Sequence, residues 1–313
     1  MRIAIYGAGG VGGYYGGRLA QDGHDVELIA RGQHLDALKE DGLTVESVEG
    51  DFHVDLPATD DPSEIDPVDV VVFCVKSFDT ADAAADLDGL LADDGAVLSV
   101  QNGVDNEPVL VDAVGSERVW GGVTYIFSTI KEPGVVEHTG GPAHILYGQY
   151  HDIDEEPPER SALADAFLDA CEEATGMSAK YTENVHATLW DKFALICAQA
   201  GLTAATRQPL GRVRANDESW SLYRQVMEEV VAVAHAKGVR FDWDPVGKWL
   251  DAMQEGSDDQ YSSLHYDLTH GKRMELDALH GSVVAHGRDA GVPVPATRAI
   301  NAVLAPQADA NAE

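Results

Sequence analysis

The chain has 313 residues, and its 54 Asp and Glu residues against 21 Lys and Arg residues give a formal net charge of −33 at pH 7. A field this negative repels nucleic acids and anionic membranes, so it excludes partners of both kinds. The acidic residues are spread along the whole length and lysine is scarce even relative to arginine. This pattern favours adaptation to high salt over a generic acidic enzyme, and we expect stability and activity to need molar salt.

The hydrophobic fraction of 44% suffices for the cores of two domains, which the length predicts. No apolar run approaches the roughly 20 residues of a membrane span. No charged-then-apolar leader precedes the first apolar segment, so we expect a cytoplasmic protein. The three cysteines, Cys74, Cys171 and Cys197, lie far apart and outside any metal-ligand spacing. A reducing compartment, thiols in the core and no metal site are the corresponding expectations.

The most informative segment is formed by the first 31 residues. Apolar residues 3–6 predict a strand, a helix of about three turns follows, and a second apolar run ends at residue 30. The glycine cluster between strand and helix is typical of a βαβ unit that binds a dinucleotide, with its phosphates on the helix N-terminus. Gly7 allows the turn, Gly9 lets the backbone approach a pyrophosphate, and Gly12 lets the helix pack close to the sheet. The predicted cofactor contacts in this turn are Gly7, Ala8, Gly9, Gly10, Val11 and Gly12. The alternative is a purely structural glycine turn.

The end of the second predicted strand discriminates between the two nicotinamide dinucleotides. NAD-binding units usually carry an acidic residue there, which accepts the ribose 2′-hydroxyl. This chain has Ala30-Arg31 instead, and Glu27 comes too early. A cation at this point favours a 2′-phosphate, so the sequence predicts NADP(H) as the cofactor. The alternative is an ordinary surface arginine.

Strand-like runs follow at residues 69–75, 96–100, 119–127, 134–138 and 144–147, with a helix expected at 80–91. The run at 69–75 is apolar throughout, which is typical of a buried parallel strand. The later runs lack long intervening helices, so they predict antiparallel pairs. A helix at about 159–175 and a short strand at 178–181 complete this part of the chain.

Helical periodicity dominates from residue 183 onward, in segments at 183–205, 217–237, 245–254 and 273–290. The sequence therefore predicts an α/β fold: a Rossmann-like, doubly wound N-terminal domain over residues 1–181 and an all-α C-terminal domain over residues 182–313. Residues 307–313 are expected to form a disordered tail. A homodimer through the helical domain stays open, because no specific residue points to it.

Five polar residues are candidates for the chemistry. Lys76 and Asn102 follow two predicted parallel strands, at the strand ends where open α/β sheets hold their ligands. The alternatives are a helix-start lysine and an ordinary Asn-Gly turn. Lys192 lies on a largely apolar helix, where it either snorkels to the surface or faces a cleft. Taken alone, Glu275 reads as a solvated helix residue and Ser263 as a turn or cap residue.

Together these pieces resemble the ketopantoate reductase (2-dehydropantoate 2-reductase) family over nearly the whole chain. The resemblance is carried by an ordered set: the glycine turn, Arg31, Val75-Lys76, residues 101–103, residues 189–192, Ser262-Ser263 and residues 275–281. It implies an NADP-dependent oxidoreductase that reduces 2-dehydropantoate to pantoate in pantothenate and coenzyme A biosynthesis.

The resemblance also implies roles for the candidate residues. Lys192 would be the proton donor, since a lysine ammonium can stabilise and protonate the oxyanion that hydride addition creates. Glu275 would be the second catalytic residue, positioning the lysine or binding the cofactor. The implied cofactor contacts are Arg31, Lys76, Asn102 and Glu275, and the implied substrate contacts are Asn102, Lys192 and Ser263.

One departure from the family pattern concerns the substrate. The better-known members carry asparagines where this chain has Ile196 and Ala200, one and two turns after Lys192, and another where it has Leu210. These substitutions make the pocket more apolar, and Gln199 on the same face either replaces the lost amides or points elsewhere. Two alternatives therefore stay open: a reductase of another small 2-oxo acid on the same fold, and a non-catalytic NADP(H)-binding sensor.

Overall fold

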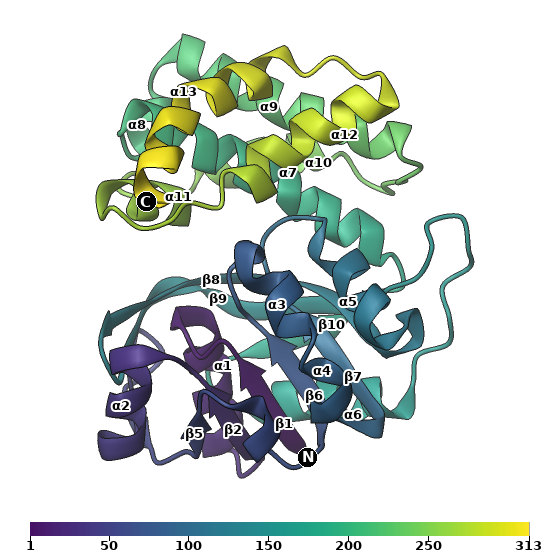
Figure 1. Cartoon of the computed structure of the whole chain (residues 1–313). Helices are drawn as coiled ribbons and strands as arrows, with labels where there is room; N and C mark the ends of the chain where they lie inside the picture. Colours follow the sequence, from purple (N-terminus) through teal and green to yellow (C-terminus); the bar gives the residue numbers. More distant parts are fainter. Residues whose placement is uncertain (313) are drawn as a thin grey trace. The chain divides into compact units, whose positions relative to one another are not determined.

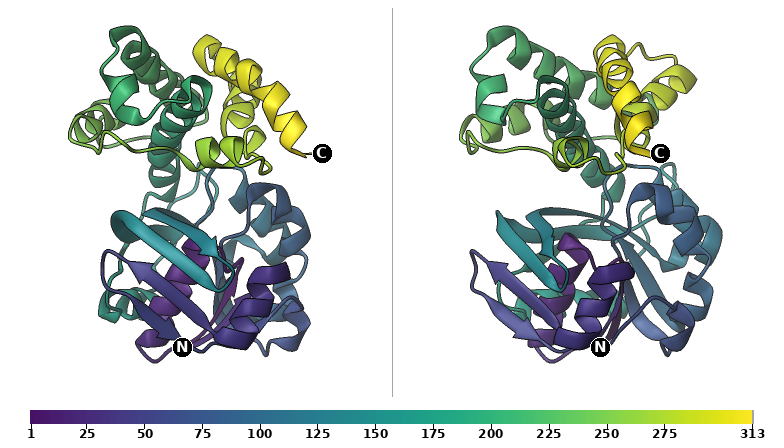
Figure 2. Two further views of the ribbon diagram at one scale, coloured as in Figure 1. Left: turned by 90° about the vertical axis from the view of Figure 1, so that its left-hand side faces the viewer. Right: turned by 60° about the vertical axis from the view of Figure 1, so that its left-hand side comes forward.

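The computed structural model describes residues 1–312 and divides the chain into two compact units (Figure 1). The first comprises residues 1–101 and 106–188, and the second comprises residues 102–105 and 189–313. Figure 2 shows the strands in the first unit, while the second unit contains helices and no strand over its described residues, which end at 312. The predicted fold class, a Rossmann-like domain followed by an all-α domain, is confirmed. The domain boundary after residue 181 stays a prediction.

The first unit is built on one mixed sheet with the strand order β4-β3-β9-β8-β7-β6-β1-β2-β5, and β10 pairs with β9 off this path. The strands are β1 Arg2–Tyr6, β2 Asp25–Ile29, β3 Leu43–Ser47, β4 Phe52–Val54, β5 Ala58–Thr59, β6 Val68–Phe73, β7 Leu91–Ser99, β8 Val119–Glu132, β9 Val135–Gln149 and β10 Ser178–Tyr181. β1 is paired in parallel with both β2 and β6. The chain leaves β1 for one side and later returns to the other, which makes the end of β1 the switch point of a doubly wound sheet.

Two helical layers cover the parallel strands because successive side chains of a strand face opposite sides. Ile3 and Ile5 belong to one core, with buried residues of α1 (Gly10–Gln21), α2 (Gly32–Asp41) and α6 (Ala162–Glu173). Ala4 and Tyr6 belong to the other, with α3 (Thr80–Ala84), α4 (Leu87–Leu90) and α5 (Asn106–Val114). This burial on both faces explains the continuous apolar run at β6.

β8 and β9 form a long antiparallel hairpin, which confirms the predicted antiparallel pairing among the later strands. The two separate runs expected at residues 134–138 and 144–147 are parts of the single strand β9. The helix expected at 80–91 is broken into α3 and α4, and its last residue already belongs to β7.

The second unit consists of helices around α7, which is buried along nearly its whole length. The helices are α7 Val185–Thr206, α8 Leu210–Arg214, α9 Asp217–Ala236, α10 Pro245–Gln254, α11 Ser263–Thr269, the π-helix η4 Asp277–Gly281, α12 Ser282–Ala290 and α13 Pro295–Ala312. The division between the units falls between Thr188 and Leu189, within α7. The sequence of α7 is apolar on nearly all sides, which is typical of a buried helix.

A buried carboxylate fixes the start of α13. Glu229 on α9 accepts hydrogen bonds from the backbone amides of Ala296 and Thr297, at 2.9 and 2.8 Å, and from the Thr297 hydroxyl at 2.8 Å. The amides of the first helical turn have no partner within the helix, and a negative charge there also suits the helix dipole. Glu229 therefore acts as the N-terminal cap of α13 from another helix.

Two expectations about the second unit were wrong. Residues 307–312 form the last turns of α13 rather than a disordered tail, and Glu313 lies outside the described residues. The Asn311 side chain holds this end by donating to the carbonyls of Asp267 and Lys272, at 3.3 and 3.0 Å. The helix expected over 273–290 starts only at Asp277, as a π-helix.

The π-helix widens the backbone next to α7. The Gly281 amide bonds the Leu276 carbonyl five residues earlier, at 3.0 Å. Within this turn the buried His280 places its Nε2 2.9 Å from the Cys197 carbonyl of α7. Such widened turns are frequent at functional sites.

Among residues 1–312, no helix has the length and hydropathy needed to cross a membrane. The same residues contain no group of three or more His, Cys, Asp or Glu side chains that could bind a metal ion. All three cysteines are free thiols.

Candidate active site

The glycine turn after β1 depends on its glycines. Gly7 has φ +96°, and a Cβ there would lie 2.9 Å from the Val75 amide nitrogen at the end of β6. A Cβ on Gly12 would lie 2.8 Å from Cγ2 of Ile5, so this glycine lets α1 pack against β1. At Gly9 a Cβ would meet nothing within 4 Å. The protein therefore gives no internal reason for a glycine at position 9, whereas a ligand that approaches the backbone closely would.

The start of α1 has the chemistry of an anion site. Gly9 is the N-cap and makes no side-chain cap hydrogen bond. The amides of Gly10, Val11 and Gly12 in the first turn have no acceptor within the helix, and the helix dipole is positive here. The turn is also held from the β8–β9 hairpin, since the Ser128 hydroxyl donates to the Gly10 carbonyl at 2.8 Å. This arrangement fits a dinucleotide pyrophosphate.

Arg31 is the N-cap of α2, two residues after the end of β2, and its side chain is 66% exposed. Its guanidinium lies 3.9 Å from the Asp79 carboxylate, an exposed pair of little energetic weight. The end of β2 is tied to the glycine turn, because the Ile29 carbonyl accepts from the amides of Gly7 and Ala8 at 3.1 and 2.9 Å. Glu27 instead faces Arg2, at 3.5 Å, and is not at the end of β2.

Gln101 joins the ends of β6 and β7 beside Lys76. Its buried amide donates to the Val75 carbonyl at 2.9 Å and to the Thr80 hydroxyl at 2.7 Å. The backbone of the neighbouring Lys76 is thereby fixed near the Gly7 turn, which contacts Val75 directly. Lys76 itself is half-buried and lies three residues after the end of β6.

Asn102 belongs by its contacts to the second unit, in the segment 102–105. Asp105 anchors this segment on α12: it accepts from the Ser282 hydroxyl at 2.5 Å and lies 2.7 Å from Nε2 of His286. Ser282 and His286 are one turn apart and so share one face of the helix. Asn102, three residues before Asp105, is therefore positioned by α12.

Lys192 is 7% exposed on α7, which excludes a side chain that snorkels to the surface. Burial lowers the pKa of Lys192 from 10.5 to about 8, and the charge of Glu275 opposes this by raising it. Glu275 is itself buried, two residues before η4. A carboxylate that acts on the lysine and a pKa close to neutrality are properties expected of a catalytic acid.

The neighbouring Asp191 has separate partners on α10 and the loop before it. Its buried carboxylate accepts from the indole of Trp243 at 2.8 Å and from the Lys248 ammonium at 2.6 Å. Its backbone carbonyl accepts from the indole of Trp249 at 3.0 Å. These three bonds fix α7 next to Lys192 and direct the Asp191 charge to Lys248.

The two serines at the start of α11 have different environments. Ser262 is the N-cap: its hydroxyl accepts from the His265 amide at 3.1 Å and lies 2.8 Å from the Thr203 hydroxyl of α7. Ser263, to which the family resemblance gives a substrate contact, is exposed. Ser262 thus attaches α11 to α7, while the next hydroxyl is accessible to a ligand.

The positions of the missing family asparagines differ in accessibility. Ile196 is half-buried, whereas Ala200 and Leu210 are buried, Leu210 completely. Gln199 is 8% exposed on the same helix. Of the three substituted positions, Ile196, one turn after Lys192, is therefore the most accessible to a bound molecule.

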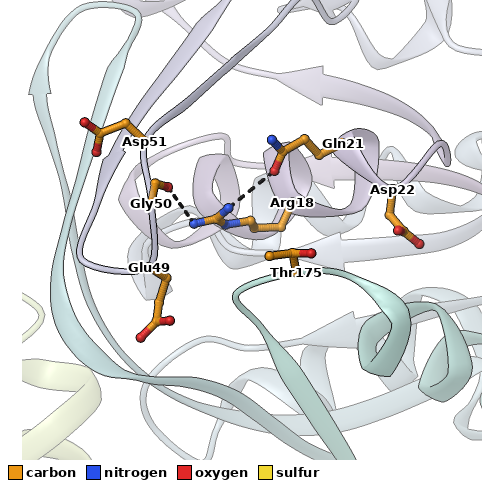
Figure 3. A pocket seen from close by; sticks show the side chains of 7 residues that line it. All are labelled: Arg18, Gln21, Asp22, Glu49, Gly50, Asp51 and Thr175. Atoms are coloured by element: carbon orange, nitrogen blue, oxygen red, sulfur yellow. Dashed lines mark hydrogen bonds between the residues drawn. The ribbon is translucent and has the colours of Figure 1, made fainter.

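A polar pocket of about 320 Å³ lies in the first unit, around Arg18 near the end of α1 (Figure 3). The buried Arg18 guanidinium donates to the Gly50 carbonyl at 2.9 Å and to Gln21 at 3.3 Å. None of the predicted site residues lines this pocket, and the glycine turn is at the opposite end of the helix. We assign Arg18 a structural role, closing the loop that joins β3 and β4.

The predicted site residues are divided between the two units. The glycine turn, Arg31 and Lys76 lie at the ends of β1, β2 and β6; Lys192, Glu275, Asn102 and Ser263 lie in the second unit. Sequence reasoning missed the anchors of these groups, namely Asp105 with Ser282 and His286, and Asp191 with Lys248. Their partners are distant in sequence; the only local signal was the Ser282–His286 spacing of one helical turn.

Comparison with known proteins shows the family of this chain. The family model described as "Ketopantoate reductase PanE/ApbA" matches residues 3–152, and its C-terminal counterpart matches residues 184–308. The 2-dehydropantoate 2-reductase of Halobacterium salinarum is 32% identical over 305 residues, which cover 96% of each chain.

Two solved structures extend the comparison. The crystal structure of a PanE/ApbA family ketopantoate reductase from Ralstonia eutropha has a TM-score of 0.88 and 38% identity, and covers all of both chains. A D-mandelate dehydrogenase solved with NADH and anilino(oxo)acetate has a TM-score of 0.89 and 23% identity, and covers 100% of this chain and 99% of its own. At that identity the second likeness concerns the fold alone. The two family models together span most of the sequence, and the chain belongs to the ketopantoate reductase family of oxidoreductases.

Proposed function

We propose that the protein is an NADPH-dependent 2-dehydropantoate 2-reductase, which reduces 2-dehydropantoate to pantoate in pantothenate and coenzyme A biosynthesis. The observation that carries the proposal is the buried Lys192, whose pKa is lowered to about 8 by burial against the opposing charge of Glu275, in a chain of this family. Relatives named for this reaction align with almost the whole sequence. Three free thiols suit the reducing cytoplasm in which such an enzyme would work.

In the proposed reaction Lys192 carries the proton. A reduced nicotinamide, when bound, supplies the hydride for the carbonyl carbon. The Lys192 ammonium hydrogen-bonds the carbonyl oxygen, stabilises the charge that develops on it and transfers a proton from Nζ. Glu275 favours the charged lysine electrostatically, so that the donor is protonated at neutral pH. Burial of both groups keeps water away and strengthens these interactions.

The binding residues divide between the two molecules. The first-turn amides of α1 would bind the pyrophosphate, and the exposed Arg31 would bind the 2′-phosphate. Lys76 and Asn102 would orient the nicotinamide half. Asn102 and the exposed hydroxyl of Ser263 would hold the carboxylate end of the substrate.

The half-buried Ile196 supports a second candidate on the same fold, a reductase of another small 2-oxo acid with a more apolar side chain. The non-catalytic sensor has less support, because a sensor gives no reason to bury a lysine beside Glu275. A buried ammonium is costly and is kept where its charge is used.

The test is NADPH oxidation in molar KCl with 2-dehydropantoate beside a panel of other 2-oxo acids. It compares wild type, Lys192→Ala and the control Lys180→Ala, which removes an exposed lysine from β10. Turnover of 2-dehydropantoate that collapses in Lys192→Ala alone is the expected result. Turnover of a different acid alone would replace the substrate, and NADPH binding without any turnover would favour the sensor.

Cofactor preference has its own test. The ratio of kcat/KM for NADPH to that for NADH should favour NADPH in wild type and fall in Arg31→Ala, with little change for NADH. A clear preference of the wild-type protein for NADH would contradict the role given to Arg31.

A further inference from the structure

His34 connects three elements around the glycine turn. It lies on the first turn of α2, three residues after Arg31, and its ring is half-buried. Nε2 lies 2.8 Å from the carbonyl oxygen of Ala8, within the glycine turn. Nδ1 accepts a hydrogen bond from the amide of Gly134, at the tip of the β8–β9 hairpin, at 3.0 Å.

These two contacts determine the form of the imidazole. The Gly134 amide is a donor, so Nδ1 must be unprotonated; the Ala8 carbonyl is an acceptor, so Nε2 must carry the hydrogen. Only the neutral Nε2–H tautomer satisfies both. Burial also lowers the pKa of His34, against the hydrogen bond to Ala8, which raises it.

The hairpin tip packs closely against α2 beside this ring. Gly134 has φ +79°, and a Cβ there would lie 3.1 Å from Cβ of Ala37, one turn after His34 on α2. Its carbonyl accepts from the Thr44 amide at 2.9 Å, so both backbone groups of Gly134 are used. The hairpin therefore gives His34 a fixed support.

The bond to Ala8 fixes a peptide unit that matters for binding. The carbonyl of Ala8 and the amide of Gly9 belong to the same planar unit, immediately before the free amides of α1. The Gly9 amide bonds the Gly7 carbonyl at 2.7 Å, so His34 and Gly7 hold the two ends of this unit. Rotation of the unit would move the backbone at Gly9, where a Cβ would meet only open space.

We propose that His34 is a positioning residue for the dinucleotide: its neutral ring holds the Ala8–Gly9 peptide in the orientation that presents the start of α1 to the pyrophosphate. Through the same ring, α2 with Arg31 at its N-cap is registered against the glycine turn. The inference rests on the proposed use of this turn for NADP(H), but not on the substrate or on the catalytic role of Lys192.

The two hydrogen bonds can be removed separately. In His34→Gln the side-chain amide nitrogen takes the place of Nε2 and can still donate to Ala8. In His34→Asn the shorter amide places its oxygen near Nδ1, so the bond from Gly134 can survive while the bond to Ala8 is lost. His144→Asn is the control: another half-buried histidine of the same unit, 2.8 Å from the Ser178 hydroxyl on β10.

The measurement is the Kd for NADPH from its fluorescence in molar KCl, with thermal unfolding and steady-state kinetics on the same proteins. We expect His34→Asn to raise Kd and the KM for NADPH about tenfold, the effect of one lost hydrogen bond of about 1.4 kcal/mol. The kcat at saturating NADPH should be retained, and His34→Gln and His144→Asn should bind as the wild type does. A merely structural role would lower Tm in both His34 variants, and the two variants would not differ in their affinity for NADPH.

Two outcomes overturn the inference: NADPH binding by His34→Asn at wild-type affinity, or equal weakening in His34→Gln and His34→Asn. If His34→Asn fails to fold, His34→Ser, which also leaves Ala8 without a donor, takes its place under the same criteria. Failure of the proposed function looks different, since the wild type would then bind NADPH without reducing 2-dehydropantoate.

Discussion

Gly201 on α7 makes room for the ring of His280 on η4. A Cβ on Gly201 would overlap Nε2 of His280, the atom that contacts the Cys197 carbonyl, and would lie 3.0 Å from Cγ2 of Ile300. The absence of one side chain thus lets a histidine from a distant segment hydrogen-bond to the helix that carries Lys192. Glu275 lies five residues before His280, so this bond also sets the register of Glu275 against α7.

We predict that Gly201→Ala lowers the free energy of unfolding by about 1–3 kcal/mol, because the added methyl displaces His280 from a packed core. Helix propensity alone would act in the opposite direction by up to about 1 kcal/mol. Urea unfolding in molar KCl measures the change. Gly89→Ala is the control, since Gly89 is also helical and a Cβ there meets nothing within 4 Å. If the Gly201→Ala protein is as stable as the Gly89→Ala protein, the His280 ring can accommodate the added methyl group and the prediction is wrong.

Acid should destabilise the protein partly through His280. Burial lowers the pKa of His280 from 6.5 to about 4, opposed by its bond to Cys197. The unfolded chain therefore binds a proton at a higher pH than the folded chain does, and stability is lost as pH falls from 6.5 toward 4. The loss from this residue is about 3 kcal/mol, from a shift of about 2.5 units at 1.36 kcal/mol each. The difference in unfolding free energy between wild type and His280→Asn, followed from pH 7 to 4, isolates this contribution; a difference independent of pH would contradict it.

The activity should fall on the alkaline side as Lys192 loses its proton. Its pKa of about 8 predicts that kcat declines as pH rises through that value. Glu275→Gln removes the charge that raises this pKa, so the alkaline limb should move to lower pH and the residual activity should be greatest in mild acid. Glu228→Gln makes the same change at an exposed position of α9 and should leave the profile unaltered. If the alkaline limb of the pH profile stays unchanged in Glu275→Gln, Glu275 does not influence the proton of Lys192 during turnover.

Loss of the Asp191 carboxylate should weaken the attachment of α10 to α7. Asp191→Ala leaves the Trp243 indole without its acceptor and removes the Lys248 ion pair. The expected loss is about 2 kcal/mol of unfolding free energy, less than for a fully buried ion pair, because the Lys248 side chain is 44% exposed. Tryptophan fluorescence follows the change, and Asp251→Ala on the exposed face of α10 is the control. Equal stability of the two variants would remove Asp191 from this role.

Stability should rise with salt. A net charge of −33 repels itself in the compact state, and the Debye length shortens from about 10 Å at 0.1 M to about 3 Å at 1 M. Unfolding temperatures in a KCl series measure the dependence, with sucrose as a stabilising solute that does not screen charge. Full stability and activity after dialysis into dilute buffer would contradict the expectation of high-salt adaptation.

Much of the fold followed from local patterns, because the elements that were predicted carry their signal in their own residues. The glycine turn and the apolar run of β6 predict a parallel sheet, and the near-continuous apolar surface of α7 predicts a buried helix. Short edge strands such as β5 and the π-helix η4 were missed, because their backbone is set by neighbours rather than by periodicity. The tail after residue 306 looked disordered for the same reason: Asn311 is ordered by carbonyls of a distant loop.

The candidate site was predictable only in part. Arg31 is recognisable as a cation where NAD-binding units usually carry an acidic residue, and Lys192 as a cation on a largely apolar helix. The groups that hold the site, such as His34 with Gly134 or Asp105 with His286, are pairs separated by 100 and 181 residues. No local spacing encodes such pairs, so they need the three-dimensional structure.

The four residues 102–105 have a consequence for dissecting the protein. They precede Leu189 by more than eighty residues, yet they pack with the helices that follow it. A helical fragment produced from Leu189 onward would leave Ser282 and His286 without Asp105, and it would also lack Asn102. A single proteolytic cut therefore cannot release the helical unit intact. Two fragments cut at Leu189 would therefore have to associate again before the segment 102–105 could pack with the helices that follow Leu189.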